Sequence, residues 1–271
     1  TQSRSSAASD VYKRQSYTIM LQRKAMHNKS NILNQFDIIL CRPSHGGNIG
    51  STARAMKTMG LSNLYLVNPK MFPSDESYAL AAGADDLLDK AYVVNSIEEA
   101  IEASNIAVGF TARKRELSQP HNNIRKTAVE IVGYAKDQRI SLIFGNETNG
   151  LSNDEIKHCQ LLSFIDADEK YSSLNLAQAV QVSCHEIRMA LNVESTNPIN
   201  QKKPTNFVNQ SQLNNFFLHF EEVLDEIQFL KKVQGERLMH RIRLLFNRTQ
   251  LDKEEINIMR GILTEIQKKI K

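Results

Sequence analysis

The chain has 271 residues, of which 41% are hydrophobic and 24% charged, and this length and composition predict a globular protein of about two domains. A disordered chain is excluded, and no uncharged apolar stretch approaches the roughly 18 residues that a membrane-spanning helix needs. The formal net charge of +4 arises in residues 1–30, which contain six basic residues and one acidic residue. The rest of the chain has 28 basic and 29 acidic residues, a net charge of −1. The overall charge therefore does not indicate a polyanionic partner.

Residues 1–30 are interpreted as a disordered or artefactual leader. Their beginning is rich in serine and has no apolar core, so it is not a secretory signal. We expect the native chain to begin at Met20 or Met26.

The cysteines are far apart in the chain and form no C-x-x-C pair. This spacing predicts neither a zinc site nor a redox couple. We expect reduced thiols in the core of a cytoplasmic protein that uses no metal. The three residues are Cys41, Cys159 and Cys184.

Between residues 31 and 193, short apolar runs rich in β-branched and aromatic residues alternate with helical patterns. The predicted strands are Phe36–Cys41, Asn63–Val67, Ala91–Val94, Asn105–Phe110, Ile140–Phe144 and Leu161–Asp166. The predicted helices are Asn48–Gly60, Ser96–Ser104, Asn123–Lys136, Ser152–His158 and Leu174–Leu191. This alternation indicates an α/β domain with a mostly parallel sheet and helices on both faces.

The last part of the chain predicts a separate, all-helical domain. Residues 194–210 are rich in Asn, Gln, Thr and Pro and are interpreted as a linker. Within residues 211–271, apolar side chains recur every three or four residues from Leu213 to Leu230 and again from Ile256 to Ile270. Asp252 and Glu255 predict the start of the final helix.

A glycine-rich turn connects the first predicted strand to a helix at H-G-G-N-I-G-S-T-A-R-A-M-K, residues 45–57. Such a turn lets backbone amides approach a ligand, but it is equally typical of a tight connection. A dinucleotide site would also need an acidic residue after the second strand, where Asn68 and Pro69 stand, and no G-K-[ST] supports a phosphate-binding loop. A nicotinamide-dependent oxidoreductase is therefore the weaker alternative. Arg54 becomes a candidate because it lies within about two turns of the glycine turn.

Two further segments combine small, polar and glycine residues. In F-G-N-E-T-N-G-L-S, residues 144–152, two glycines flank Glu147, and Ser152 with Glu155 predicts a helix-capping box. A structural turn explains the glycines and the cap but not the carboxylate. In Y-S-S-L-N-L-A-Q-A-V, residues 171–180, small polar residues precede a helix and are typical of an N-cap.

In this order and spacing the three segments resemble the motifs of the SPOUT class of RNA methyltransferases, over roughly residues 36–191. Within the class they are most similar to the TrmJ family of tRNA 2′-O-methyltransferases, which modify anticodon-loop nucleotide 32, and the segments L-F-N-R and L-D-K-E-E-I-N-I-M-R-G-I-L near the C-terminus are also similar to bacterial members. The resemblance implies a trefoil knot at the end of the α/β domain. It also implies a homodimer whose active site uses both subunits.

The resemblance further implies S-adenosylmethionine as methyl donor, with S-adenosylhomocysteine as product and no metal. The donor would contact Phe110, Thr111, Ala112, Gly145, Asn146, Gly150, Ile165, Ser172, Ser173 and Leu174, largely through backbone groups that small residues leave accessible. The catalytic residues would be Arg54, Asn48, Glu147, Ser173 and Asn175. The sequence departs from the family at Asn146, where many members have Arg, and at Gln178, where Met is common.

In-line transfer to a ribose 2′-hydroxyl requires alignment of the attacking oxygen and removal of its proton. Because a guanidinium rarely deprotonates at neutral pH, we expect Arg54 to clamp a phosphate, while the other catalytic residues orient the site. Predicted RNA contacts are Arg113, Lys114, Arg115, Arg237, Arg241, Arg243 and Arg248, although a charge run is often only a solvated face. Another SPOUT 2′-O-methyltransferase, acting at a different tRNA or rRNA position, and a non-catalytic RNA-binding dimer remain alternatives.

Overall fold

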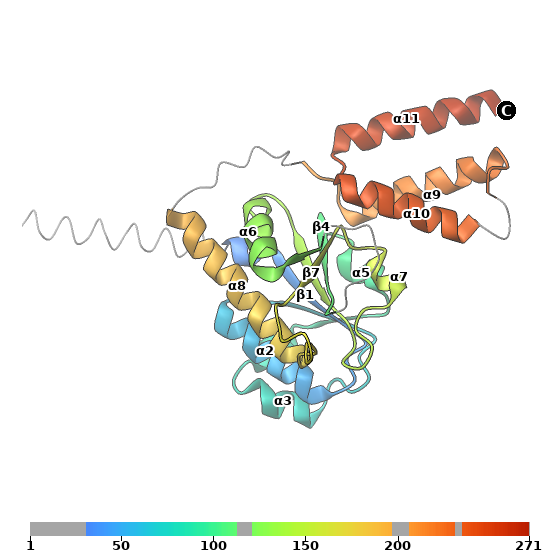
Figure 1. Ribbon diagram of the computed structural model, residues 1–271. Coiled ribbons are helices and arrows are strands. Elements are labelled where there is room, and N and C mark those ends of the chain that lie inside the picture. The colour runs from blue at the N-terminus through green and yellow to red at the C-terminus, as the bar shows by residue number, and fades with distance from the viewer. Residues whose placement is uncertain (1–30, 113–120, 197–205, 231–234, 271) are drawn as a thin grey trace, which may run out of the picture.

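The computed structural model describes residues 31–112, 121–196, 206–230 and 235–270 (Figure 1). The predicted leader and the predicted RNA contacts Arg113, Lys114 and Arg115 lie outside these residues. Among the helices that are described, none is long and apolar enough to cross a membrane.

The described part of the chain contains a seven-stranded sheet in which all neighbouring strands are parallel. The strands are β1 (Phe36–Cys41), β2 (Asn63–Val67), β3 (Tyr92–Val94), β4 (Ile106–Phe110), β5 (His121–Asn123), β6 (Ile140–Phe144) and β7 (Leu161–Phe164), in the order β3-β2-β1-β6-β4-β7-β5. Every residue of β1, β4 and β6 is buried, as expected for central strands covered on both faces. The carboxyl ends of these strands therefore lie along one edge of the sheet.

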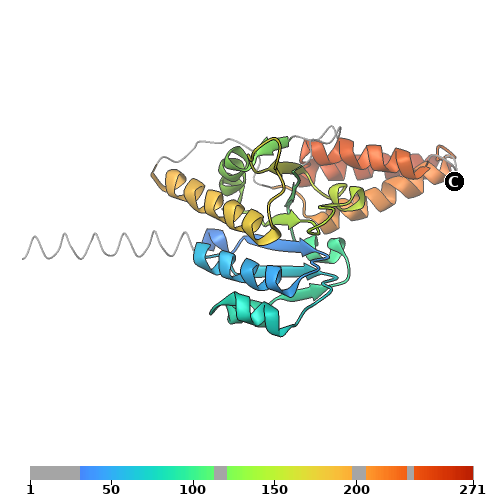
Figure 2. The same ribbon diagram turned by 60° about the horizontal axis from the view of Figure 1, so that its bottom comes forward.

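Helices cover the sheet on both faces. One core cluster contains side chains from α2 (Gly46–Met59), α6 (Ile124–Tyr134) and α8 (Leu176–Thr196), together with the two short helices α3 (Asp75–Ala81) and α4 (Asp85–Asp89). A second cluster, on the opposite face, contains side chains from α5 (Ile97–Ile101) and α7 (Asn153–Ile156). In Figure 2, α8 and α2 lie side by side across the strands.

All the predicted strands and helices of the α/β region form, and the sheet confirms the predicted fold class. The structure adds β5, α3 and α4, which the sequence analysis did not predict. The residues of β5 are His121, Asn122 and Asn123, which carry no apolar pattern, and the strand forms because it pairs with β7 at the edge of the sheet. The two added helices are short, and α3 begins with a capping box of Ser74 and Ser77.

Three helices follow the α/β region: α9 (Gln210–Glu226), α10 (Gly235–Thr249) and α11 (Lys253–Ile270). Phe216, Phe217 and Phe246 form the centre of their own core cluster. The predicted apolar stripe runs to Leu230, but α9 ends at Glu226 because Gln228 adopts a left-handed backbone with a φ of 58°.

The helical region is attached at the amino ends of the strands. The side-chain amide of Asn105, just before β4, donates to the carbonyl of Phe207 over 2.9 Å, and Gln210 N–H donates to the carbonyl of Ser104 over 2.8 Å. The side-chain amide of Asn247 donates to the carbonyl of Lys157 over 2.8 Å. Phe207 belongs to the predicted linker, yet it is buried, because its ring packs edge-on against Tyr134.

Candidate active site

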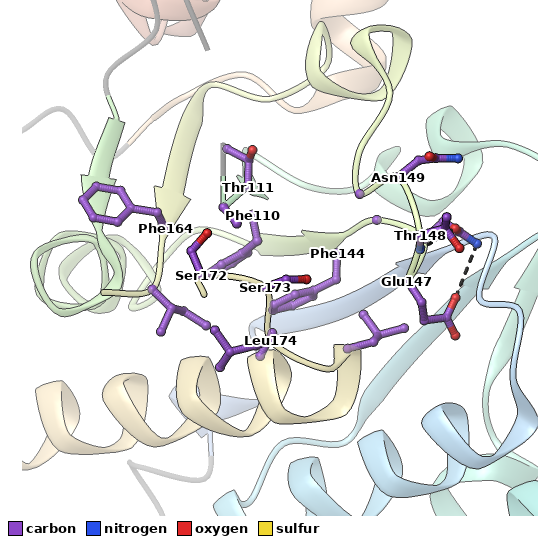
Figure 3. A pocket seen from close by; sticks show the side chains of 17 residues that line it. Phe110, Thr111, Phe144, Glu147, Thr148, Asn149, Phe164, Ser172, Ser173 and Leu174 are labelled. Carbon is purple, nitrogen blue, oxygen red and sulfur yellow. Dashed lines mark hydrogen bonds between the residues drawn. The ribbon is translucent and has the colours of Figure 1, made fainter. Parts of the chain in front are cut away.

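A cavity of about 260 Å³ opens at the carboxyl ends of β4, β6 and β7 (Figure 3). Every residue that the sequence analysis assigned to the methyl donor lines this cavity: Phe110, Thr111, Ala112, Gly145, Asn146, Gly150, Ile165, Ser172, Ser173 and Leu174. The structure adds lining residues that the analysis did not assign to the donor: Phe144, Glu147, Thr148, Asn149, Phe164, Leu176 and Ala179. The second and third motif segments therefore meet at this cavity, together with the residues that end β4.

Two aromatic rings form an apolar part of the cavity lining. The rings of Phe110 and Phe144 are stacked with their centroids 4.4 Å apart. In Figure 3 these rings lie between the loop that carries Glu147 and the segment Ser172–Leu174. Phe144 ends a predicted strand and begins the second motif, and the sequence analysis did not assign it to the donor.

The loop after β6 folds back tightly on itself. The N–H of Gly150 donates to the carbonyl of Asn146 over 2.8 Å, and Gly150 has a φ of 66°, which favours glycine. A Cβ atom at Gly145 would collide with the backbone of Gly150 and Leu151. Both glycines of the second motif are thus required by the shape of the loop.

The third motif begins α8 and is tied to the first motif. The Oδ1 atom of Asn175 accepts hydrogen bonds from the backbone of Ala177 at 2.9 Å and Gln178 at 3.4 Å, as the predicted N-cap would. Its Nδ2 atom donates to Oδ1 of Asn48 over 2.8 Å. Asn48 in turn donates through Nδ2 to Oε1 of Glu147 over 2.9 Å. One chain of side-chain hydrogen bonds therefore connects the three segments.

Glu147 is the centre of this network. Its Oε2 atom accepts hydrogen bonds from the N–H and the hydroxyl of Ser44 at 2.9 and 2.7 Å, and its Oε1 atom accepts one from the N–H of His45 at 3.3 Å. The side-chain amide of Asn146 adds a bond of 3.3 Å. Burial raises the pKa of Glu147, but hydrogen bonds from Asn48 and Ser44 outweigh that effect and lower the pKa from 4.5 to about 2. The carboxylate is therefore ionised and a poor base.

Among the described residues that line the cavity, Glu147 is the one charged side chain. Fixed negative charge favours a ligand that carries positive charge near it. The remaining polar groups in the lining are backbone amides and carbonyls, hydroxyls and side-chain amides.

The other predicted catalytic residues differ in their positions. Ser173 lines the cavity, whereas Asn48 and Asn175 contact the network beside it. Arg54 is exposed on α2 and does not line the cavity of its own chain. The structure therefore brings together all the predicted catalytic residues except Arg54.

Sequence reasoning missed two residues outside the cavity lining, Ser44 and Arg42, that form contacts with Glu147 and Glu155. Ser44 donates twice to Glu147, and Arg42 forms an ion pair with Glu155. The predicted capping box of Ser152 and Glu155 is confirmed. No pattern in the sequence indicated Arg42, because its partner is more than 100 residues away.

The predicted RNA-binding arginines in the helical region lie on α10. Arg237, Arg241 and Arg248 are exposed, and their spacing of four and seven residues puts them on one side of the helix. Arg243 differs from them. Its guanidinium lies 4.6 Å from the centre of the Phe217 ring and donates to Asn214 over 3.3 Å.

Comparison with known proteins assigns the chain to a family. Residues 35–185, more than half of the chain, match the SpoU rRNA Methylase family, and residues 211–271 match the C-terminal domain of tRNA methyltransferase TrmJ. The chain belongs to the SpoU methylase family. This membership confirms the resemblance that the three motifs indicated.

TrmJ members of the SpoU methylase family are similar along nearly the whole chain. The tRNA (cytidine/uridine-2′-O-)-methyltransferase TrmJ of Yersinia enterocolitica is 40% identical over 242 residues, which cover 89% of this chain and 94% of the relative. The TrmJ of Pectobacterium atrosepticum is 41% identical over 239 residues, covering 88% and 98%. The crystal structure of TrmJ from Z. mobilis has 28% identity and a TM-score of 0.74, and covers 85% of this chain and 98% of its own.

The low pKa of Glu147 predicts a specific dependence of stability on pH. Above pH 4.5 this carboxyl is ionised in both the folded and the unfolded chain, and its stabilising contribution is fully present. As the pH falls from 4.5 to about 2, the unfolded chain takes up the proton first, so the contribution is lost. Glu147→Gln lacks it, and we expect the deficit in the free energy of unfolding of this variant, measured with urea, to be smaller at pH 3 than at pH 7.

The matched control is Glu169→Gln, because Glu169 is exposed. Its free energy of unfolding is expected to follow the wild type at both pH values. A deficit for Glu147→Gln that is as large at pH 3 as at pH 7 would contradict the low pKa.

Proposed function

We propose that this chain is an S-adenosylmethionine-dependent tRNA methyltransferase that acts in the cytoplasm on the ribose 2′-hydroxyl of C or U at anticodon-loop nucleotide 32. The observation that carries the proposal is the convergence of the second and third motif segments on one cavity, with Asn48 of the first motif hydrogen-bonded to both beside it. The chain is also similar to TrmJ along most of its length. The residue assignments and the target position rest on the motif resemblance.

The chemistry of the cavity lining suits S-adenosylmethionine. Small residues leave the backbone of three loops accessible, and Phe110, Phe144, Ile165 and Leu174 supply apolar surface for a flat base. The ionised Glu147 suits a cationic sulfonium. When bound, the donor supplies an electrophilic methyl group on positively charged sulfur.

The chain's own residues orient the reaction. Glu147 holds Asn48, and Asn48 holds Asn175, so these amides have fixed positions beside the cavity. The oxygens of Glu147 are occupied by donors and its pKa is about 2, so Glu147 positions the site and does not accept the ribose proton. We assign Ser173, which lines the cavity, to contact with the target nucleotide.

We assign Arg54 to the active site of a second copy in a homodimer. Its exposed position on α2, outside the cavity of its own chain, supports this assignment. Apolar exposure on the neighbouring α8 also supports a dimer, because Met189 is 38% and Val193 55% exposed. There the guanidinium would clamp a phosphate beside the target nucleotide.

We propose two further features of organisation from the resemblance. The α/β domain, residues 31–193, would contain a trefoil knot, and the linker 194–210 would lead to a helical domain of residues 211–271. The exposed arginines of α10 would bind the phosphate backbone of tRNA, together with Arg113, Lys114 and Arg115.

Incubation of the protein with bulk tRNA and radiolabelled S-adenosylmethionine tests the function directly. We expect label on tRNA, and mapping is expected to find a 2′-O-methyl group on nucleotide 32. Methylated base with unmethylated ribose would contradict the proposed reaction. Label on another ribose would retain the reaction and correct the position.

Mixing two inactive variants tests the position of Arg54. Arg54→Ala removes the clamp, and Ala179→Phe fills the cavity with a ring. In a mixed dimer that shares residues between subunits, one site has both defects and the other has none. We therefore expect methylation to return when the two variants are coexpressed.

If Arg54 acted in its own chain, both sites of the mixed dimer would stay inactive and no activity would return. Arg54→Lys separates a bidentate clamp from simple charge, because lysine carries the charge without the fork. A turnover close to that of the wild type would contradict the clamp.

Salt titration tests the stripe of arginines on α10. Removing one phosphate contact is expected to reduce the slope of log affinity against log salt by about one. We expect this change for Arg241→Gln, measured by tRNA binding between low and moderate salt. Arg260→Gln, which removes an exposed arginine on α11, is the control and should keep the wild-type slope. Equal slopes for the two variants would contradict the assignment of α10.

A further inference from the structure

Arg42 lies outside the three motifs, at the point where β1 ends. Its backbone has a φ of 53°, in the left-handed region that residues other than glycine rarely adopt. Its N–H donates to the carbonyl of Val67 over 2.7 Å, so the turn is held against the neighbouring strand. The position of Arg42 is thus defined by the sheet.

The side chain of Arg42 forms a two-bond ion pair with Glu155. Nε donates to Oε1 over 3.0 Å and Nη2 to Oε2 over 2.8 Å. Glu155 is buried, and its Oε2 atom also accepts the N–H of Ser152 over 2.6 Å, which caps α7. Because a buried carboxylate needs its donors, this contact holds the end of the loop that lines the cavity.

The backbone of Arg42 holds the beginning of the same loop. Its carbonyl accepts a hydrogen bond from Nδ2 of Asn146 over 2.8 Å. Residues 146–150, between these two contacts, line the cavity. One residue directly after β1 therefore holds both ends of a loop that is more than 100 positions away in the sequence.

We infer that Arg42 is a positioning residue for the methyl-donor cavity, acting through Glu155 and Asn146 to hold residues 146–151 in the conformation that receives the donor. The inference rests on the proposed function for the identity of the ligand. Arg42 does not line the cavity, so the inference assigns it no contact with the donor. Its loss is expected to weaken donor binding more than it slows transfer in the saturated enzyme.

A second arginine–glutamate ion pair provides a control that separates positioning of the loop from a general effect on stability. Arg125 on α6 also contacts a glutamate through two bonds, from Nε over 3.3 Å and from Nη2 over 3.1 Å, to Glu186 on α8. Neither residue lines the cavity. Arg125→Ala therefore removes a two-bond arginine–glutamate pair, more exposed than that of Arg42, at a place where loop 146–151 is not held.

The test compares Arg42→Ala and Arg125→Ala in the full chain. Calorimetry measures the Kd for S-adenosylhomocysteine, and tRNA methylation at varied S-adenosylmethionine measures KM and kcat. For Arg42→Ala we expect Kd and KM to rise about tenfold while kcat stays within about twofold of the wild type. For Arg125→Ala we expect all three to be unchanged. An unchanged Kd in Arg42→Ala, or a lower kcat at unchanged KM, would overturn the inference.

A measurement without ligand separates this inference from the proposed function. Amide hydrogen exchange in residues 146–151 is expected to be faster in Arg42→Ala than in the wild type and unchanged in Arg125→Ala. Equal exchange in all three proteins would overturn the positioning role. If the wild type binds no S-adenosylhomocysteine, the proposed function fails, while faster exchange confined to Arg42→Ala still supports the role of Arg42 in holding the loop.

A conservative variant covers the case in which Arg42→Ala does not fold. Arg42→Lys keeps the positive charge and the backbone contact to Asn146 but cannot make both bonds to Glu155. We expect the Kd of Arg42→Lys for S-adenosylhomocysteine to rise above that of the wild type, but by less than tenfold. A Kd equal to that of the wild type, with loop exchange also equal, would overturn the inference.

Discussion

The hydrogen-bonded carboxylate of Glu147 is the interaction on which the site depends. Its donors are on the loop after β1, on the first turn of α2 and on its own loop. Asn48 extends the connection to Asn175 at the start of α8. A carboxylate in this position would be unfavourable without these donors, and with them it connects the three motif segments.

The residues that hold the loops in place differ in kind from most of those that line the cavity. The charged side chains of Arg42 and Glu155 bond to each other outside the cavity lining. The lining itself is formed by backbone, small residues, the stacked rings of Phe110 and Phe144, and the hydrogen-bonded carboxylate of Glu147. A lining of this kind requires loops in a fixed conformation.

The sequence predicts this protein well where a signal is local. Buried runs such as Phe36–Cys41 predict strands, and the Ser152–Glu155 capping box predicts a helix start. The lining of the cavity was predictable because the motif resemblance supplied the long-range information that periodicity lacks. The polar strand β5 was not predictable, because its pairing with β7 decides its conformation. Arg42 was missed for a similar reason, since its role depends on a partner that only the folded chain brings near.

The side chain of Asn146 is held by hydrogen bonds close to its own loop. Its side-chain amide donates to the carbonyl of Arg42 and to Glu147, and its Oδ1 atom accepts the N–H of Thr148 over 2.9 Å. These three bonds close a local turn that a longer, charged side chain could not form in the same way. At this position the present chain uses the residue for loop geometry.

The attachment of the helical region constrains how a large ligand can lie on the molecule. Phe207 and Gln210 are bound beside the amino end of β4, whereas Phe110 at its carboxyl end lines the cavity. A five-residue strand is roughly 17 Å long, so the two regions of one chain are on opposite rims of the sheet. A molecule that contacts both rims of one chain must therefore reach across at least the length of this strand.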